Sequence, residues 1–183
     1  MKTNSPQKKP ILRFSPTAWA KLLFMRDQSS NEVGGFGIAP ADDLLYISDF
    51  ALVSQNVTCA SVSFVDESVA DFFEDQVEAG LKPEQFARIW IHTHPGNCPE
   101  PSTVDEETFA RVFGGCDWSV MAIIAQKGST YARLKFKAGP GGELIIPMSV
   151  DYHRDFSGTE FDRWQQEYQA CVIPEDDLSL IHI

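Results

Sequence analysis

The stretch that decides the fold covers residues 86–113 and is FARIWIHTHPGNCPEPSTVDEETFARVF. Its first nine residues alternate, which places two isoleucines on one face of a strand and His92 and His94 on the other. A proline-rich loop follows, and the remaining twelve residues, beginning at Ser102, predict a short helix that a Gly-Gly pair ends. A strand, a tight loop and a helix are therefore expected to form one unit.

Outward from this unit, the pattern predicts further helices and strands in mixed order. Helical spacing of apolar residues predicts a helix at residues 15–27, with an N-cap at Ser15, and one at residues 66–79, which Gly80 ends. A C-terminal helix is expected at residues 159–172. Apolar or alternating runs predict strands at residues 11–14, 31–39, 44–53, 60–65, 117–126, 131–137 and 143–150. This order of elements predicts an α+β fold in which a sheet is flanked by helices.

The size and composition of the chain predict one globular domain. The 183 residues include 43% hydrophobic and 22% charged side chains, which is an ordinary balance for a folded protein. Residues 1–10 are polar, and we expect a flexible N-terminal tail there. Residues 11–183 are expected to form the domain, with a helix near its C-terminal end.

Charge and cysteine content limit the partners and the compartment. A net charge of -11 disfavours nucleic acid as a partner, and it fits either a basic protein partner or solubility alone. No signal peptide and no apolar run of about 18 residues is evident, so no membrane association is expected. None of the four cysteines forms a C-x-x-C pair, and a reducing cytoplasmic setting fits best.

Three side chains in the deciding stretch have the residue types of a metal site. His92 and His94 project from the same face of the expected strand, so both imidazoles can reach one ion. The prolines of the loop limit how far it can extend, which allows Asp105 to return to the histidines. Two imidazoles and one carboxylate suit zinc, and a set of three protein ligands leaves one position open, as in catalytic sites.

Two more residues are candidates for the chemistry around such an ion. Glu32 lies at the entry to a glycine-rich strand and is the candidate proton carrier, and Ser102 is the candidate donor to a developing oxyanion. Simpler readings exist for each piece. A His-x-His pair can be an ordinary polar pair, Ser102 to Asp105 can be only a helix cap, and Glu32 can be a surface acid.

The joint spacing of these residues resembles the signature of the JAMM metalloproteases, also called the MPN+ or JAB domain. That signature is an upstream glutamate, then His-Ser/Thr-His, seven residues, and Ser-x-x-Asp. Here His92-Thr93-His94 is followed by residues 95–101 and then by Ser102-Thr103-Val104-Asp105, without a gap. Glu32 precedes Gly34 and an apolar strand, which is similar to the upstream element. The resemblance covers roughly residues 11–150.

The resemblance implies a fold, a cofactor and an activity. The fold would be a curved mixed β-sheet flanked by helices, the cytidine-deaminase-like arrangement. One zinc ion per chain would be held by His92, His94 and Asp105, with Glu32 as general acid/base and Ser102 as oxyanion stabiliser. The activity would be that of a deubiquitinase-like zinc isopeptidase or peptidase, which cleaves after the C-terminal tail of ubiquitin or a ubiquitin-like protein.

Departures from the family pattern leave alternatives open. Glu100-Pro101 stands where many eukaryotic deubiquitinases have an aromatic residue, which is more similar to compact prokaryotic members and favours a ubiquitin-like partner. The alternatives are a non-catalytic MPN scaffold, a processing protease for a small sulfur-carrier protein, and a zinc hydrolase of small molecules. Cys98 lies in the loop and is either a passive residue, a redox-sensitive one or a spare ligand. The sequence does not indicate the oligomeric state.

Overall fold

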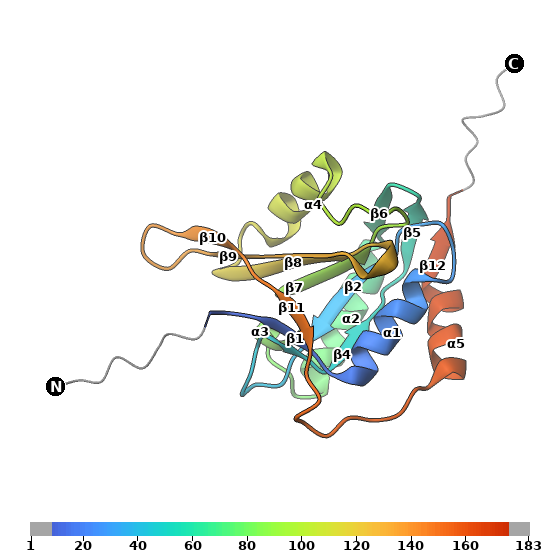
Figure 1. Ribbon diagram of the computed structural model, residues 1–183, viewed down its shortest axis with the longest axis horizontal. Helices are drawn as coiled ribbons and strands as arrows, with labels where there is room; N and C mark the ends of the chain where they lie inside the picture. The colour runs from blue at the N-terminus through green and yellow to red at the C-terminus, as the bar shows by residue number, and fades with distance from the viewer. Residues whose placement is uncertain (1–8, 176–183) are drawn as a thin grey trace, which may run out of the picture.

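β7 (Ile89–Thr93) lies inside a six-stranded sheet of the computed structural model, which describes residues 9–175 (Figure 1). The strand order is β10-β9-β8-β7-β2-β4. β7 and β8 run parallel, and all other neighbours in this sheet are antiparallel, so the sheet is mixed. The other strands of this sheet are β2 (Gly34–Ile38), β4 (Asp49–Ala51), β8 (Trp118–Ile124), β9 (Thr130–Phe136) and β10 (Gly142–Ile145).

Two three-stranded sheets flank the central sheet within the described residues. In the first, β1 pairs in parallel with β11 and with β3. In the second, β5 pairs in parallel with β12 and forms an antiparallel hairpin with β6. The strands are β1 (Leu12–Phe14), β3 (Tyr46–Ile47), β5 (Gln55–Thr58), β6 (Ser61–Phe64), β11 (Met148–Val150) and β12 (Val172–Pro174).

The helices begin and end at residues whose chemistry explains the boundaries. Ser15 caps the first helix by accepting a hydrogen bond from Ala18 N–H, and Ser102 caps the fourth in the same way from Asp105. Gly80, with φ at 86°, follows the end of the second helix. The helices are α1 (Pro16–Arg26), α2 (Asp66–Glu78), α3 (Pro83–Phe86), α4 (Thr103–Phe113) and α5 (Phe161–Cys171), with a short 3-10 turn at Gln126–Gly128.

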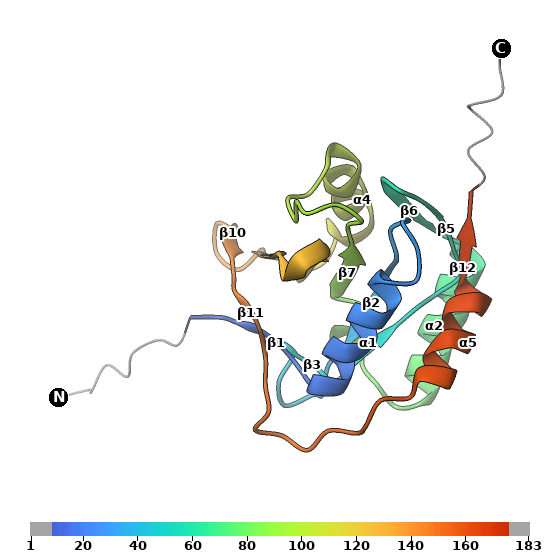
Figure 2. The same cartoon turned by 45° about the vertical axis from the view of Figure 1, so that its right-hand side comes forward.

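The central sheet separates two hydrophobic cores. Ile89 and Ile91 of β7 belong to the core that α1 covers together with α5, whereas Trp90 belongs to the core that α2 and α4 cover. Figure 2 shows α1 and α5 side by side, with α4 in a different layer. This arrangement confirms the predicted alternation of Ile89, Trp90 and Ile91 within β7, and it confirms an α+β fold with a mixed sheet and flanking helices.

Gln55 joins the β5–β6 hairpin to the central sheet. Its side chain is fully buried, accepts a hydrogen bond from Gly34 N–H (2.8 Å) and donates to Gly34 O (2.9 Å). One amide side chain thus replaces the backbone ladder between β5 and β2. Glu32 N–H donates to Thr58 O (2.9 Å), which ties the segment before β2 to the same hairpin.

Several predicted strands differ in extent from those observed. Residues 44–53 form two short strands, because the chain passes at Ser48 from β3, which pairs with β1, to β4, which pairs with β2. Residues 143–150 also divide, because Pro147 has no N–H for a ladder and separates β10 from β11. β7 begins at Ile89 rather than at Phe86, because Pro83 and the cap at Lys82 start a short helix there.

Four of the described elements were not predicted: α3, β5, β12 and the 3-10 turn at Gln126–Gly128. The helix predicted at residues 159–172 is confirmed as α5. The flexible tail predicted at residues 1–10 lies mainly outside the described residues. Among residues 9–175, no helix is long and apolar enough to cross a membrane.

Candidate metal centre

His92, His94 and Asp105 converge at the end of β7, and all three side chains are buried. One potential ligand atom from each lies within 4.8 Å of the others. His92 Nε2 is 3.2 Å from Asp105 Oδ1, and His94 Nε2 is 3.4 Å from Asp105 Oδ2. The three residues predicted from the sequence as ligands therefore form one group that could hold a metal ion.

The local fold explains this convergence. His92 is the fourth residue of β7 and pairs with Gly34 of β2. His94 follows directly after β7, where its N–H donates to Ile124 O of β8 (2.9 Å). Asp105 lies in the first turn of α4, and its Oδ2 accepts a hydrogen bond from Ser102 N–H (2.7 Å). The helix cap thus orients the carboxylate toward the histidines, so the cap reading and the ligand reading of this segment are compatible.

The imidazole nitrogens without hydrogen-bond partners in the His92, His94 and Asp105 cluster fit a divalent cation. Within the described part of the chain, neither His92 Nε2 nor His94 Nε2 has a hydrogen-bond partner, although both atoms are buried. His94 Nδ1 contacts the Cys98 carbonyl oxygen (3.0 Å), so this nitrogen carries the proton and Nε2 keeps its lone pair. Buried polar atoms without partners are costly, and an ion at this position would satisfy them.

Glu32 lies beside the three-residue cluster and is also buried. Its Oε1 is 3.7 Å from His94 Nε2, and its Oε2 has no hydrogen-bond partner among the described residues. Burial raises the pKa of Glu32 to about 7, although the charge of His94 opposes the shift. Asp105, a like charge, adds to it. The structure places this predicted proton carrier at the site, and the surface-acid reading does not hold.

The cluster shifts the pKa values of its members in different directions. Burial lowers the pKa of His92. Burial also disfavours the charged form of His94, but Asp105 and the Cys98 carbonyl outweigh it and raise its pKa above the ordinary value. Burial disfavours ionisation of Asp105, but the two imidazoles outweigh it and hold its pKa well below the usual range. Asp105 is thus an anion at neutral pH, as a metal ligand must be.

Ser102 and Cys98 lie at the edge of the cluster. Ser102 Oγ accepts from Asp105 N–H (3.2 Å), and no described residue accepts the hydroxyl proton of Ser102, which stays available to donate. The Cys98 side chain is exposed and does not belong to the metal-ligand group found among residues 9–175. Its backbone carbonyl orients His94, a role that no property of the cysteine side chain predicts.

Trp90 is a supporting residue that sequence reasoning did not single out. Its ring stacks on His92 at 4.3 Å between centroids and an interplanar angle of 26°. The stacking fixes the orientation of an imidazole that has no partner at Nδ1 among the described residues. The available signal was the two-residue spacing, because Trp90 and His92 share one face of β7.

The chain matches no protein-family model and no curated protein. The motif spacing and the geometry of the cluster therefore carry the functional interpretation by themselves.

Proposed function

We propose that the protein is a zinc-dependent hydrolase of the JAMM type, an isopeptidase or peptidase that acts on the C-terminal tail of ubiquitin or a ubiquitin-like protein. The observation that carries this proposal is the convergence of two imidazole nitrogens and an anionic carboxylate oxygen, with Glu32 beside them. Nitrogen and oxygen ligands of this kind are those that catalytic zinc takes. The proposal includes the family's cytidine-deaminase-like fold, with which the mixed sheet and flanking helices are compatible.

In this proposal each residue has a defined task. His92, His94 and Asp105 hold the ion, and the chemistry that bound zinc supplies is polarisation of the scissile carbonyl and activation of water. Glu32 accepts the proton of the attacking water and transfers it to the leaving amine. A divalent cation favours the ionised form of Glu32, so the carboxylate is ready to act as a base near neutral pH. The Ser102 hydroxyl donates to the developing oxyanion, an interaction typically worth about 3 kcal/mol.

The β5–β6 hairpin supports an extended protein tail as the substrate. β6 pairs only with β5 within residues 9–175, so its other edge offers unpaired backbone groups. A tail that ends in two glycines can lie against such an edge, because it forms main-chain hydrogen bonds and needs little width. A processing protease for a small sulfur-carrier protein would use the same site and the same kind of tail.

Metal content is the first test. We expect about one zinc per chain by elemental analysis, and loss of that zinc in His92→Ala. His153→Ala is the matched control, because His153 is exposed and lies outside the cluster. Absence of zinc from the native protein, together with no zinc uptake on titration, would contradict the proposal.

Turnover is the second test. Ubiquitin and a panel of ubiquitin-like proteins, each fused through its C-terminal glycines to a reporter, are incubated with the zinc-loaded protein. We expect Glu32→Gln to retain zinc and to lose turnover by at least about a hundredfold, since a general base contributes about 10²–10⁴. Glu107→Gln, an exposed residue of α4, should be unaffected. Full activity of Glu32→Gln removes Glu32 from the mechanism, and a zinc protein that cleaves nothing supports a scaffold.

A further inference from the structure

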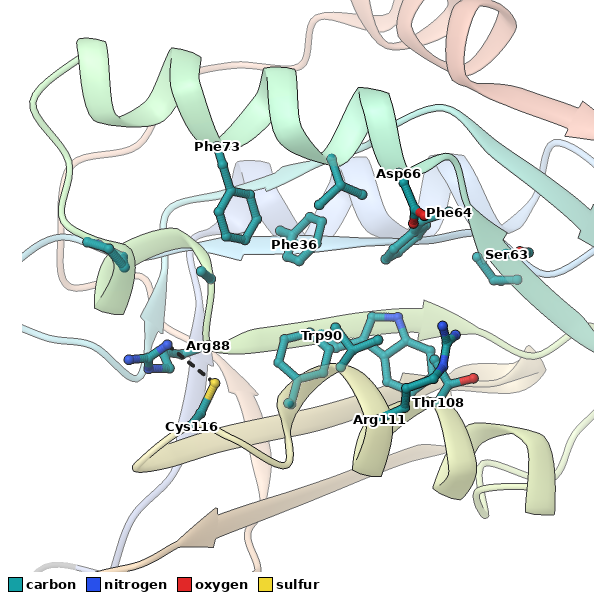
Figure 3. A pocket seen from close by; sticks show the side chains of 16 residues that line it. Phe36, Ser63, Phe64, Asp66, Phe73, Arg88, Trp90, Thr108, Arg111 and Cys116 are labelled. Atoms are coloured by element: carbon teal, nitrogen blue, oxygen red, sulfur yellow. Dashed lines mark hydrogen bonds between the residues drawn. The ribbon is translucent and has the colours of Figure 1, made fainter.

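A cavity of about 490 Å³ lies next to the metal centre, between α2 and β6 on one side and α4 on the other (Figure 3). Its volume is within the range of pockets that bury a ligand, and aromatic side chains form much of its wall. The lining includes Val62, Phe64, Asp66, Trp90, Arg111 and Val112. Most of the lining is apolar, so the cavity fits an apolar group better than a charged one.

Trp90 connects this cavity to the metal centre. It lies in the cavity lining and stacks on His92 at 4.3 Å. Its indole is 2% exposed, yet its Nε1 has no hydrogen-bond partner among the described residues. Figure 3 shows this nitrogen on the ring edge that is turned toward Phe64. A buried donor without a partner is unfavourable, so an acceptor brought in by a ligand would be stabilised there.

The free edge of β6 borders the same cavity. Val62 and Phe64 of β6 contribute to the lining, and β6 has no strand partner other than β5 within residues 9–175. An extended peptide that adds to β6 would run along the cavity, with alternate side chains pointing into it. A cavity beside a strand edge is thus shaped for the side chain of a strand-like ligand.

We infer that this cavity is the specificity pocket of the enzyme and takes a bulky apolar side chain from the substrate tail, at the residue before the two terminal glycines. The inference rests on the proposed function. Trp90 is two residues before His92, which corresponds to roughly 7 Å along a strand. An extended peptide covers the same distance in about two residues. With two glycines next to the scissile bond, the third residue is the first that can fill the pocket.

The carboxyl-terminal tail suits this position better than the leaving group does. In an isopeptide the leaving group is a lysine side chain, which has no backbone to pair with β6, whereas the tail has one along its whole length. Charge does not select the side chain strongly, because Arg111 and Asp66 lie on opposite walls (Figure 3). Their opposite charges offset each other, and the third charged residue of the lining, Arg88, is paired with Asp117 (3.3 Å). Size and apolar character are therefore the expected basis of selection.

Binding of short peptides tests the pocket independently of turnover. Zinc-loaded Glu32→Gln is titrated with fluorescent peptides of the form Ala-X-Gly-Gly, where X is Leu, Phe, Ala, Glu or Lys. We expect Leu and Phe to bind about tenfold to a hundredfold more tightly than Ala, Glu or Lys, as is typical when a side chain fills an apolar pocket. One extra glycine between X and the terminus should abolish this preference, because it moves the side chain away from the pocket.

A variant that fills the cavity provides the second arm. Val112 of α4 lines the cavity and is 46% exposed, so Val112→Trp adds bulk to the pocket without changing the core. We expect it to reduce the affinity of the Leu peptide to that of the Ala peptide. Val77→Trp is the matched control, because Val77 is 56% exposed and does not line the cavity.

The outcomes separate this inference from the proposed function. Equal affinities for all five peptides, no binding of any peptide, or an unchanged preference in Val112→Trp would overturn the pocket while leaving zinc-dependent turnover to its own test. A tighter affinity after deletion of residues 176–183, which include four apolar side chains, would show that the chain's own end competes for the cavity, and it would also overturn the inference. A clear Leu preference without cleavage of any fused protein would support the pocket and contradict the hydrolase.

Discussion

His92 and His94 are two residues apart, but their surroundings prepare them differently for a metal. Burial disfavours the charged ring of His94, but Asp105 and the Cys98 carbonyl, which contacts Nδ1, outweigh it and raise the pKa of His94. His92 is fully buried, and burial lowers the pKa of its ring, which favours the neutral form. A metal requires a free lone pair on both rings, so zinc binding competes with protonation of His94 more strongly than with protonation of His92.

This difference predicts that zinc affinity depends on pH in a defined direction. Because the pKa of His94 is raised, we expect the affinity to weaken as the pH falls through that value, while Asp105 stays ionised throughout. At pH values below the raised pKa of His94, zinc binding should release protons from the site. Calorimetric titration in two buffers with different ionisation enthalpies measures the number released. Identical apparent enthalpies in both buffers would contradict the prediction.

Glu32 predicts a second pH effect, on the stability of the metal-free protein. The pKa of Glu32 is raised to about 7 in the folded state. The contribution of protonated Glu32 to the free energy of unfolding is therefore fully present below its unfolded pKa, and it is lost as the pH rises through 7. The wild type should therefore lose stability relative to Glu32→Gln between about pH 5 and pH 8. We expect about 1–2 kcal/mol, with allowance for partial screening. Urea unfolding at several pH values measures it, and a constant difference would contradict it.

At the residue scale, sequence reasoning succeeded where side-chain direction follows from a repeat. Alternation along β7 places His92 on the same face as Trp90, and this geometry holds in the structure. The contribution of Cys98 was not predictable, because it comes from a backbone carbonyl whose direction depends on the loop conformation. Gln55 was missed for a related reason. Its amide binds a backbone that is distant in sequence, and no local pattern indicates such a contact.

At the element scale, α4 determines where Asp105 lies, and an ion pair adds to the apolar packing of Phe109 and Phe113 that holds α4 against the sheet. Arg133 of β9 donates to both carboxylate oxygens of Glu106 (2.8 and 2.7 Å), the residue after Asp105. The Arg133 guanidinium also lies 5.6 Å from the centre of the Phe109 ring. Two parallel hydrogen bonds fix both the position and the rotation of the helix start more firmly than one contact would.

This pair predicts a loss of metal affinity on mutation at a distance from the ligands. We expect Arg133→Met or Glu106→Gln to weaken zinc binding by about tenfold, the lower end of the effect of residues that support ligands. Arg133→Lys should not restore the affinity, because lysine lacks the planar fork. Competition with a chelating dye measures the affinity. Arg163→Met, which removes an exposed pair with Glu160, is the control. Unchanged affinity in the Arg133 variants would mean that α4 is held by other contacts.

Helices and strands could be predicted where the apolar pattern of the sequence reflects packing on a single helix face or pairing within a single sheet. The helices at residues 16–26 and 66–78 were found within one or two residues, because their apolar spacing and caps are local signals. The strand predicted at residues 44–53 was wrong in its continuity, since its two halves pair with different sheets. The β5–β6 hairpin was found only in part, because β5 depends on β12, which lies more than a hundred residues later in the chain.

At the scale of the whole molecule, the C-terminal segment links the helical layer to the hairpin beside the site. α5 packs on α1, and β12 follows it directly and pairs with β5. Figure 2 shows α5 and β12 forming one side of the molecule. A buried lysine anchors this side of the molecule. Nζ of Lys21 in α1 lies 2.6 Å from Oε2 of Glu167 in α5 and 3.4 Å from Oδ1 of Asp49.

The ion pair between Lys21 and Glu167 predicts that mutation of its two members changes the free energy of unfolding by different amounts. The Lys21 side chain is 5% exposed and the Glu167 side chain 22%, so the two ions do not lose the same amount of solvation. Glu167→Gln leaves a buried ammonium with only the half-exposed Asp49, and we expect it to lower the free energy of unfolding by about 2 kcal/mol. Lys21→Met removes the buried charge and leaves a carboxylate that water and Leu52 N–H can satisfy, so we expect a loss below about 1 kcal/mol.

Denaturant unfolding of the two variants, with and without zinc, measures this asymmetry and locates its consequences. The hairpin is tied to β2 through Gln55 rather than through α5, so zinc affinity should change less than twofold in either variant. A larger loss in Lys21→Met than in Glu167→Gln would show that the stem of the lysine contributes more by packing than its charge costs. A large loss of zinc affinity in either would show that α5 and the metal centre are coupled through β12 and β5, and that the C-terminal segment belongs to the working site.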